Sequence, residues 1–321
     1  VRGCGDSQDT GLFQFCRMIS FGRILAQADI VLRGHVLNWV WRPRMRRREV
    51  RGAVTRQAVG RYVDRYVLPP STDFTQEPVP GSGQEEKIYS IWLQGEDSAP
   101  AIVRACWRSV RTHCRQELVI KDEAQLLSEL DLPDYVVSKY RAGRISRAHF
   151  SDICRIELLY RYGGIWLDAT DFVTADFPKW LQDEDFFIYM SGEDIGGAYA
   201  FVQNCFFRSR RANYILGAWR AAIFEYWKHE DSVIDYFVHQ LLLWRVVSRD
   251  PKAAELFAAM PKISQNATHM LWFGHRDEPF DKELFDSLTS GALFQKTEYK
   301  SSSARCPVPG SFAEKMMGMY L

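Results

Sequence analysis

The amino-acid sequence predicts an α/β protein with a mainly parallel sheet, a helical extension before it and a helical part after it. Short β-prone runs alternate with amphipathic segments between residues 86 and 170, which is typical of βαβ units. Residues 149–171 combine a helix, a two-glycine turn and a buried strand that ends at a carboxylate. Long amphipathic patterns follow at 211–228 and 231–248. The length of 321 residues suits one large α/β domain over 86–321 plus an extension.

Residues 1–68 alternate apolar and basic positions, which predicts a helical, basic N-terminal extension. A tryptophan-containing run, 36–41, leads into an arginine cluster. The cluster consists of Arg42, Arg44, Arg46, Arg47, Arg48 and Arg51. Tryptophans beside arginines suit a helix lying on an anionic membrane surface, and the alternative is an exposed helix with a solvated charge run. Nucleic-acid binding is disfavoured because no recognised nucleic-acid fold accompanies the cluster.

A linker separates this extension from the alternating elements. Residues 69–85 are rich in Pro, Ser, Thr and Gly, and they predict that linker. Pro100 suits the first turn of a helix. In chain order the expected elements are a strand over Lys87–Leu93, a helix from Ala99–Pro100, a strand over Leu118–Ile120, a helix over Ala124–Leu130, and strands over Phe186–Tyr189 and Phe201–Phe207.

The segment 149–171 is the most informative part of the chain. Its helix is expected from Phe150 to about Arg161, because apolar residues recur there at spacings of three and four. Gly163–Gly164 can supply the positive φ that ends a helix. A short β-prone run then leads directly to Asp168. Ligands of open α/β sheets bind at the carboxyl ends of the strands, so a functional acid is expected at this position.

Composition excludes several classes of protein. Hydrophobic content of 46% indicates a globular core, and 41 basic against 40 acidic residues give no net-charge signal for a partner. Seven cysteines without a Cys-x-x-Cys spacing argue for reduced thiols and against a disulfide framework or zinc site. No uncharged apolar run reaches ~18 residues, and no signal peptide is apparent. We therefore expect a cytoplasmic protein, with peripheral contact to the inner face of the membrane if the basic extension binds there.

Residues 149–171 also resemble the sugar-nucleotide-binding core of glycosyltransferases with the GT-A (Rossmann-like) fold. The most similar group contains capsular polysaccharide synthesis proteins, fungal outer-chain mannosyltransferases and clostridial glucosylating toxins. In it, a helix with Ser-Asp-x-x-Arg runs through Tyr-Gly-Gly into a strand ending Leu-Asp-x-Asp. The matching residues here are Ser151, Asp152, Arg155, Tyr162, Gly163, Gly164, Leu167 and Asp168. The capsular branch commonly reads Trp-Leu-Asp-Ala-Thr, as do residues 166–170. A weaker similarity lies at 88–100, and the resemblance spans roughly 86–300.

The resemblance implies transfer of a hexose from a nucleoside-diphosphate sugar to a glycan or polyprenyl-linked acceptor in surface (capsular) polysaccharide synthesis. It also implies retention of configuration and a requirement for Mn²⁺ or Mg²⁺, with Asp168 as the metal ligand. The relatives carry a second acid where this chain has Thr170, and Asp171 follows one residue later. Three options remain open: Thr170 and water complete the metal shell, the chain turns so that Asp171 reaches the metal, or the metal is bound weakly.

The helix of this segment would supply two further catalytic residues beside Asp168. Asp152 and Arg155 stand three residues apart and are neighbours on one side of the helix. By the resemblance, Asp152 accepts hydrogen bonds from sugar hydroxyls and Arg155 supports the sugar or the phosphate. The alternative is an ordinary surface ion pair.

The resemblance also suggests donor-binding residues outside that pair. Trp92 would stack on the nucleotide base, and Trp166 shares a strand face with Asp168 and would line the pocket. An ordinary core tryptophan is the alternative for both. Gly164 is included in the donor-binding set, and Lys296 would meet the diphosphate. Other residues that could close over the site are Asn266, His269, Gln295 and Thr297, whereas His239, on an apolar helix, is expected to be a core histidine.

Two rival functions remain. A metal-dependent hydrolase or phosphotransferase could use Asp168 and Asp171, but it needs more acids or histidines than the nearby His149 and Asp176. A degenerate, non-catalytic transferase-like scaffold is supported by Thr170. Phosphate-loop, dinucleotide-binding and nucleophile-elbow motifs do not occur, which disfavours P-loop kinases, nicotinamide dehydrogenases and α/β-hydrolases.

Overall fold

The computed structural model describes most of the chain. The described residues are 21–30, 44–69, 72, 74, 86–192 and 200–320, with backbone alone over 44–54. The side chains of the arginine cluster therefore lie outside the described residues, as does most of the stretch expected to be a linker. Within the described part, no helix combines the length and the apolarity needed to cross a bilayer.

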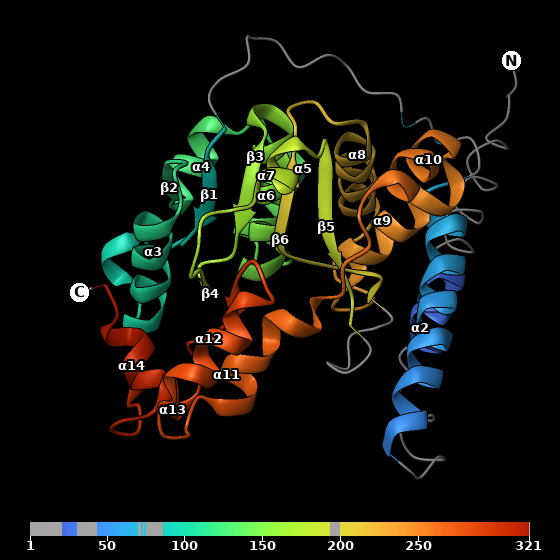
Figure 1. The fold of residues 1–321 in the computed structure, drawn as a ribbon. Helices are drawn as coiled ribbons and strands as arrows, with labels where there is room; N and C mark the ends of the chain where they lie inside the picture. Colours follow the sequence, from blue (N-terminus) through green and yellow to red (C-terminus); the bar gives the residue numbers. More distant parts are fainter. Residues whose placement is uncertain are drawn as a thin grey trace, which may run out of the picture.

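A five-stranded sheet forms the centre of the described structure (Figure 1). Its order is β2 (Leu118–Lys121), β1 (Ile88–Ile91), β3 (Gly164–Leu167), β6 (Val202–Ser209) and β5 (Phe186–Met190). Strand β1 pairs in parallel with β2 and β3, whereas β6 pairs antiparallel with β3 and β5. In this sheet β6 alone runs against the other strands, so the predicted α/β fold with a mainly parallel sheet is confirmed.

Helices cover the sheet and extend beyond it. Those between β1 and β5 are α3 (Ala101–His113), α4 (Glu123–Glu129), α5 (Asp134–Arg141), α6 (Arg147–Tyr162) and α7 (Lys179–Asp183). After β6 come α8 (Tyr214–His229), α9 (Val238–Arg249), α10 (Pro251–Ala259), α11 (Met270–His275), α12 (Lys282–Ser290), α13 (Ser302–Arg305) and α14 (Phe312–Gly318). Helices α11 to α14 gather at one end of the sheet beside β4 (Asp171–Phe172), which pairs antiparallel with β7 (Gln295–Lys296) (Figure 1).

The N-terminal helices pack onto this body. A helix over residues 21–30 is followed by α2 (Arg44–Tyr66), in agreement with the predicted helical character. Val59 and Val63 of α2 are fully buried in the same hydrophobic core as the sheet. The Arg245 guanidinium on α9 holds both oxygens of Asp64, at 2.9 and 2.7 Å from Nη2. The second half of α2 is therefore part of the main core.

The second long C-terminal helix begins later than expected. The sequence pattern suggested a start at residue 231, which is wrong, because α9 begins at Val238. The intervening residues form turns held by local hydrogen bonds. Tyr226 donates its hydroxyl to the carbonyl of Ser232 at 2.7 Å, and Asp235 Oδ1 accepts from the backbone of Phe237 at 2.8 Å. These hydrogen bonds stabilise turns over residues that the apolar periodicity had assigned to a helix.

Candidate functional site

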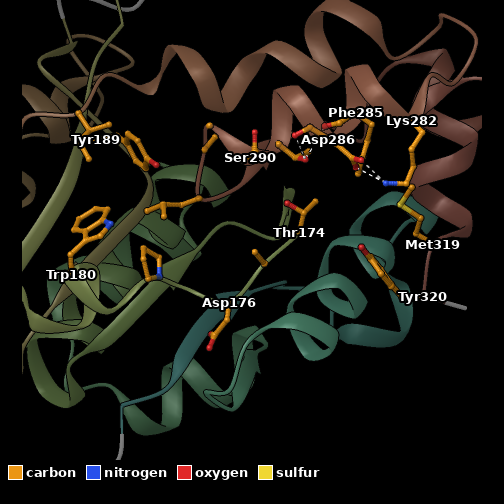
Figure 2. Close-up of a pocket in the computed structure, with 17 residues that line it drawn as sticks. Thr174, Asp176, Trp180, Tyr189, Lys282, Phe285, Asp286, Ser290, Met319 and Tyr320 are labelled. Carbon is orange, nitrogen blue, oxygen red and sulfur yellow. Dashed lines mark hydrogen bonds and ion pairs between the residues drawn. The ribbon is translucent and has the colours of Figure 1, made fainter.

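Two cavities of the described surface contain acidic residues that the sequence singled out, and their chemistry differs. The larger, 880 Å³, is lined by residues of α7, β5 and α12, together with the C-terminal Met319 and Tyr320 (Figure 2). It contains Asp176, but that carboxylate lies 2.9 Å from Nε of Arg115. A cleft of 550 Å³ shares no lining residue with it and contains Asp152, Arg155 and Asp168. We call this second cavity the Asp168 cleft.

The Asp168 cleft lies at the carboxyl ends of two parallel strands. Trp92 follows β1 directly, and Asp168 follows β3 directly. These strands are paired in register, Tyr89 opposite Trp166, so their ends open at the same edge of the sheet. This edge is where ligands of open α/β sheets bind.

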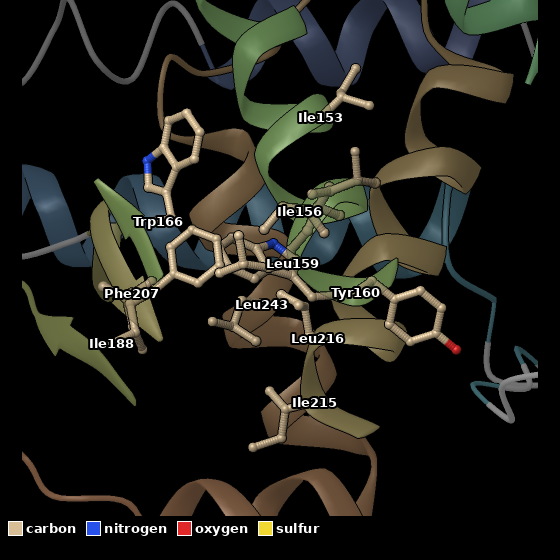
Figure 3. Close-up of a cluster of buried hydrophobic side chains, with 14 of the residues drawn as sticks. Ile153, Ile156, Leu159, Tyr160, Trp166, Ile188, Phe207, Ile215, Leu216 and Leu243 are labelled. Atoms are coloured by element: carbon tan, nitrogen blue, oxygen red, sulfur yellow. The ribbon is translucent and has the colours of Figure 1, made fainter. Parts of the chain in front are cut away.

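Helix α6 holds Asp152 and Arg155 at the cleft because its other face is buried. Ser146 caps the helix by accepting from the backbone of His149 at 3.2 Å. Ile153, Ile156 and Leu159 point into the hydrophobic core that Figure 3 shows around them. A helix fixed by such a face cannot rotate without exposing it, so the opposite residues keep their positions.

The helix ends at two glycines, and the second is required by close backbone packing. Gly163 has φ +71° and Gly164 has φ +104°. A Cβ on Gly164 would lie 2.3 Å from the carbonyl oxygen of Lys87. This contact is at the end of β3 opposite to Asp168, and Gly164 does not line the cleft. The structure therefore assigns Gly164 to strand packing, so its expected place among the donor-binding residues is corrected.

Both carboxylate oxygens of Asp168 already have donors. Oδ1 accepts from the indole N–H of Trp166 at 2.9 Å and lies 3.1 Å from Nη1 of Arg155. Oδ2 accepts from the ammonium of Lys296 at 2.7 Å. Trp166 itself is buried, with 1% exposure, so it combines the core and pocket roles that the sequence left open.

The chain turns immediately after Asp168 and brings a second carboxylate back. The backbone N–H of Asp171 donates to the carbonyl of Asp168 at 3.0 Å. Oδ1 of Asp171 then lies 3.0 Å from the same Lys296 ammonium. Burial raises the pKa of Asp171 to about 8, against the opposing effect of Lys296. Burial disfavours the charged form of Lys296, but Asp168 and Asp171 outweigh it and raise the pKa of the ammonium.

These residues do not fit a divalent metal ion as they are arranged. The position between the two carboxylates holds the Lys296 ammonium, and Arg155 takes the remaining oxygen of Asp168. The backbone carbonyl of Thr170 accepts from both the N–H and the hydroxyl of Thr297, at 2.7 and 2.9 Å. Among the residues described, no group of three or more His, Cys, Asp or Glu side chains could hold a metal ion. The expected ligands therefore form a carboxylate–ammonium cluster.

Arg155 lines the cleft and is buried. Its side chain is 8% exposed, so the alternative of a surface ion pair with Asp152 is wrong. Nη2 lies 3.2 Å from Asp152 Oδ1, Nη1 donates to the carbonyl of Asn204 at 2.6 Å, and the guanidinium covers the ring of Trp166 at 4.5 Å. A single guanidinium thus joins both carboxylates of the cleft.

Asp152 has further partners on β6 and α9. The side-chain amide of Asn204 donates to Oδ1 at 3.0 Å, and Nδ1 of His239 lies 3.4 Å from Oδ2. Burial acts to raise the pKa of Asp152, but Arg155 and His239 outweigh it and hold the pKa below its usual value. His239 is fully buried as expected of a core histidine, yet it also faces the site.

Aromatic side chains form the wall beside β1. Trp92 donates its indole N–H to Ser98 Oγ at 3.0 Å, and its ring meets the edges of Trp107 and Tyr299 at 6.4 and 5.2 Å. Both Trp92 and Tyr299 line the cleft. The wall offers flat apolar surface at one side of a cleft whose centre is charged.

Some of the remaining candidate residues line the cleft, and others hold the segments around it in place. His269 lines the cleft, whereas Gln295 and Thr297 are buried and hold β7 in place, and Asn266 does not line it. His149, a candidate for the rival hydrolase, has both ring nitrogens engaged, with Ser146 at 2.8 Å and the carbonyl of Tyr236 at 3.1 Å. The lining residues that sequence reasoning missed include Arg147, Asn204, Tyr236, Gln240, Tyr299 and Lys300. Only Arg147 had a signal, one helical turn before Ser151.

Comparisons with known proteins identify the family of the chain. The family model described as "Capsular polysaccharide synthesis protein" matches residues 43–316. A search of curated proteins found no match. Among solved structures the chain is similar to a "PaToxG Glycosyltransferase", with 10% identity and a TM-score of 0.38 over 93% of this chain and 97% of that one. Because the family model spans most of the chain, including α6, β3 and Lys296, the protein belongs to the capsular polysaccharide synthesis protein family, as the sequence resemblance predicted.

Proposed function

We propose that this protein is a glycosyltransferase that moves a hexose from a nucleoside-diphosphate sugar to a glycan or polyprenyl-linked acceptor in surface polysaccharide synthesis. The observation that carries the proposal is the meeting of Asp152, Arg155, Asp168 and Lys296 in one cleft at the carboxyl ends of β1 and β3. Such a cleft provides both a site for sugar hydroxyls and a site for phosphates.

The charge of the cleft suits a diphosphate. Its lining includes two more cationic side chains than carboxylates. The cations are Arg147, Arg155, Lys296 and Lys300, and the carboxylates are Asp152 and Asp168. A diphosphate diester carries one negative charge on each phosphate, so the bound donor would bring the cleft close to neutrality. Charge complementarity of this kind favours the binding of anions and raises their association rate.

Each part of the donor has a matching part of the cleft. Asp152 accepts hydrogen bonds from sugar hydroxyls, since Arg155 and Asn204 both approach its Oδ1 and orient the carboxylate. Arg155 faces the phosphates and stabilises negative charge as the leaving group departs. Trp92 and Tyr299 flank the nucleotide base. This allocation leaves the acceptor to approach from the open side of the cleft.

Retention of anomeric configuration is expected from the resemblance to the retaining relatives. Asp168 is enclosed by Trp166, Arg155 and Lys296, which is a poor environment for a covalent nucleophile. Attack by the acceptor on the same face as the departing diphosphate is then the consistent route. NMR assignment of the new glycosidic linkage checks it, and an inverted product contradicts it.

A panel of nucleotide sugars tests the proposal directly. The melting temperature is measured with UDP-, GDP-, CDP- and dTDP-sugars, alongside titration calorimetry and donor consumption. We expect one nucleotide to stabilise the protein and Asp152→Asn to weaken binding of its sugar conjugate by at least tenfold, while the free nucleotide still binds. Asp176→Asn, in the other cavity, is the matched control. A folded protein that no nucleotide sugar stabilises would contradict the assignment and favour the scaffold alternative.

A further inference from the structure

We propose that the ammonium of Lys296 takes the place of a divalent metal ion in this cleft, so that Lys296 and Arg155 together neutralise the departing diphosphate and transfer proceeds without metal. The proposal rests on the proposed function of the same cleft, and it changes the metal requirement that the family resemblance implies. Three separate features of the described residues carry it: the position of the ammonium, the rigidity of its support and the occupation of Asp168.

The ammonium lies where a bridging cation would lie. Nζ of Lys296 is 2.7 Å from Oδ2 of Asp168 and 3.0 Å from Oδ1 of Asp171. Asp171 is fully buried, and Lys296 supplies the ion pair that it makes. A metal ion held by both carboxylates would need this same space, and moving the lysine away would leave the Asp171 carboxyl buried without this partner.

The fold fixes this lysine more firmly than an ordinary surface lysine. Lys296 lies opposite Asp171 in the β4–β7 ladder. Its neighbour Gln295, with 1% exposure, donates to the carbonyls of Ala267 and Leu288 at 3.0 and 2.9 Å. On its other side Thr297, also 1% exposed, is bound to Thr170. The Lys296 side chain is 17% exposed, so a preorganised cation faces the cleft from a rigid segment.

Thr170 fits the same scheme. It stands where the relatives whose strand ends Leu-Asp-x-Asp carry a second acid, and its backbone carbonyl anchors Thr297, beside the lysine. The acid of the following position, Asp171, points to the ammonium. At position 170 this chain therefore lacks the carboxylate that could bind a metal, and the carboxylate at position 171 contacts Lys296 instead.

The chemical step balances with the groups named. The bond between the anomeric carbon and the distal phosphate oxygen breaks, and its electron pair leaves on that oxygen. The acceptor hydroxyl forms the new bond to the anomeric carbon and loses its proton, which the departing phosphate oxygen takes up. The negative charge that develops on the diphosphate lies beside Lys296 and Arg155, and neither residue changes its protonation state.

The first test uses the unaltered protein. After exhaustive treatment with EDTA, donor turnover should stay within twofold of the value with added Mn²⁺ or Mg²⁺. Electron paramagnetic resonance should show no saturable Mn²⁺ binding to the protein alone, and with the nucleoside diphosphate no more Mn²⁺ binding than the nucleotide shows by itself. Loss of turnover in EDTA that Mn²⁺ restores, with Mn²⁺ binding that Asp168→Asn removes, would overturn the proposal.

The second test removes the ammonium. Lys296→Met combined with Asp171→Asn avoids an unpaired buried carboxylate, and kcat is expected to fall by ~10²–10³, the loss typical for one preorganised donor. Lys296→Ala alone frees Oδ2 of Asp168 and Oδ1 of Asp171 and should acquire Mn²⁺ binding detectable by electron paramagnetic resonance. Lys121→Met is the matched control, because Lys121 is 16% exposed, pairs with Glu129 at 2.6 Å and does not line the cleft. A double variant that keeps kcat within threefold would overturn the proposal.

The outcomes separate this proposal from the function on which it rests. Turnover that needs metal rejects the role of Lys296 and leaves the glycosyltransferase assignment intact. A folded protein that neither binds nor consumes any nucleotide sugar, with metal or without it, rejects both.

Discussion

The indole N–H of Trp227 donates a hydrogen bond to Nε2 of His239 at 2.9 Å. Because an indole nitrogen can only donate, Nε2 is the accepting nitrogen and the neutral ring carries its proton on Nδ1. That nitrogen lies 3.4 Å from Oδ2 of Asp152. Trp227, which does not line the cleft, therefore determines that His239 presents a proton to Asp152, and it acts as a positioning residue two steps from the proposed sugar site.

Removing the Trp227 donor should change the tautomer of the His239 imidazole while the fold is retained. In Trp227→Phe, Nε2 of His239 loses its partner, and the ring can exchange between its two neutral tautomers. We expect the affinity for the nucleotide sugar to fall by about tenfold, equivalent to one hydrogen bond to a charged group. The ¹⁵N shifts of His239 should move from a single tautomer toward a mixture. Unchanged shifts would show that Trp227 does not set the tautomer.

Two histidines of the cleft region, the buried His239 and the half-buried His269, predict acid sensitivity. Burial lowers the pKa of His239 and lowers that of His269 to about 4. In the unfolded chain a histidine titrates near pH ~6.5. Between about pH 6.5 and 4 the unfolded chain therefore binds protons that the folded one does not, so the free energy of unfolding falls as the pH falls.

Urea unfolding at pH 7.5, 6 and 5 measures this loss. His269→Gln and His239→Gln should each flatten the dependence, because each removes one group whose pKa differs between the two states. A variant that is equally acid-sensitive would show that its histidine does not contribute.

Asp168 should be required for activity, whereas its replacement should leave the fold intact. In Asp168→Asn the cleft gains positive charge, and the amide can no longer accept from both Arg155 and Lys296 through charged oxygens. We expect kcat/KM to fall by at least 10² while the circular dichroism spectrum is retained. Activity within threefold of the unaltered protein would exclude Asp168 from the reaction.

Trp92 should contribute to nucleotide binding through its ring. Trp92→Ala removes a stacking surface, and the affinity for the free nucleotide should fall by the ~1–3 kcal/mol of one base–aromatic contact. Trp92→Phe keeps a ring and should recover most of the affinity. Trp180→Ala is the control, since Trp180 is 38% exposed and lines the larger cavity. Equal losses in the alanine and phenylalanine variants would indicate a structural effect.

Gly164 should matter for stability alone. A Cβ there meets the Lys87 carbonyl at 2.3 Å on a backbone with φ +104°, so Gly164→Ala should destabilise the protein by at least ~3 kcal/mol. Gly274→Ala, on α11 with nothing within 4 Å of its Cβ, should be neutral or slightly stabilising. Denaturant midpoints of the two variants compare them. A stable Gly164→Ala protein that loses only donor affinity would restore the donor-binding role.

How far the sequence predicts this structure depends on how local each signal is. The helix, the glycine turn and Asp168 were predictable because capping, periodicity and strand length act within a few residues. The extra helix Asp134–Arg141 and the late start of α9 were not, because their boundaries depend on contacts with distant elements. Asn204 donates to Asp152, and Gln240 donates to Oδ1 of Asn204. No local sequence pattern marks either residue as part of the site. Lys296 was suggested only by the family resemblance.

The β4–β7 ladder has a consequence for the order in which the cleft acquires its charge. The carboxylates of Asp152, Asp168 and Asp171 precede residue 172, whereas Lys296 and Lys300 come from the last tenth of the chain. Before that segment pairs with β4, the lining cations Arg147 and Arg155 only balance the lining carboxylates Asp152 and Asp168, and the cleft has no excess of positive charge. Pairing of the two-residue strand β7 with β4 adds the two lysines that give the cleft its positive excess, so a chain that has not finished folding should hold the donor weakly.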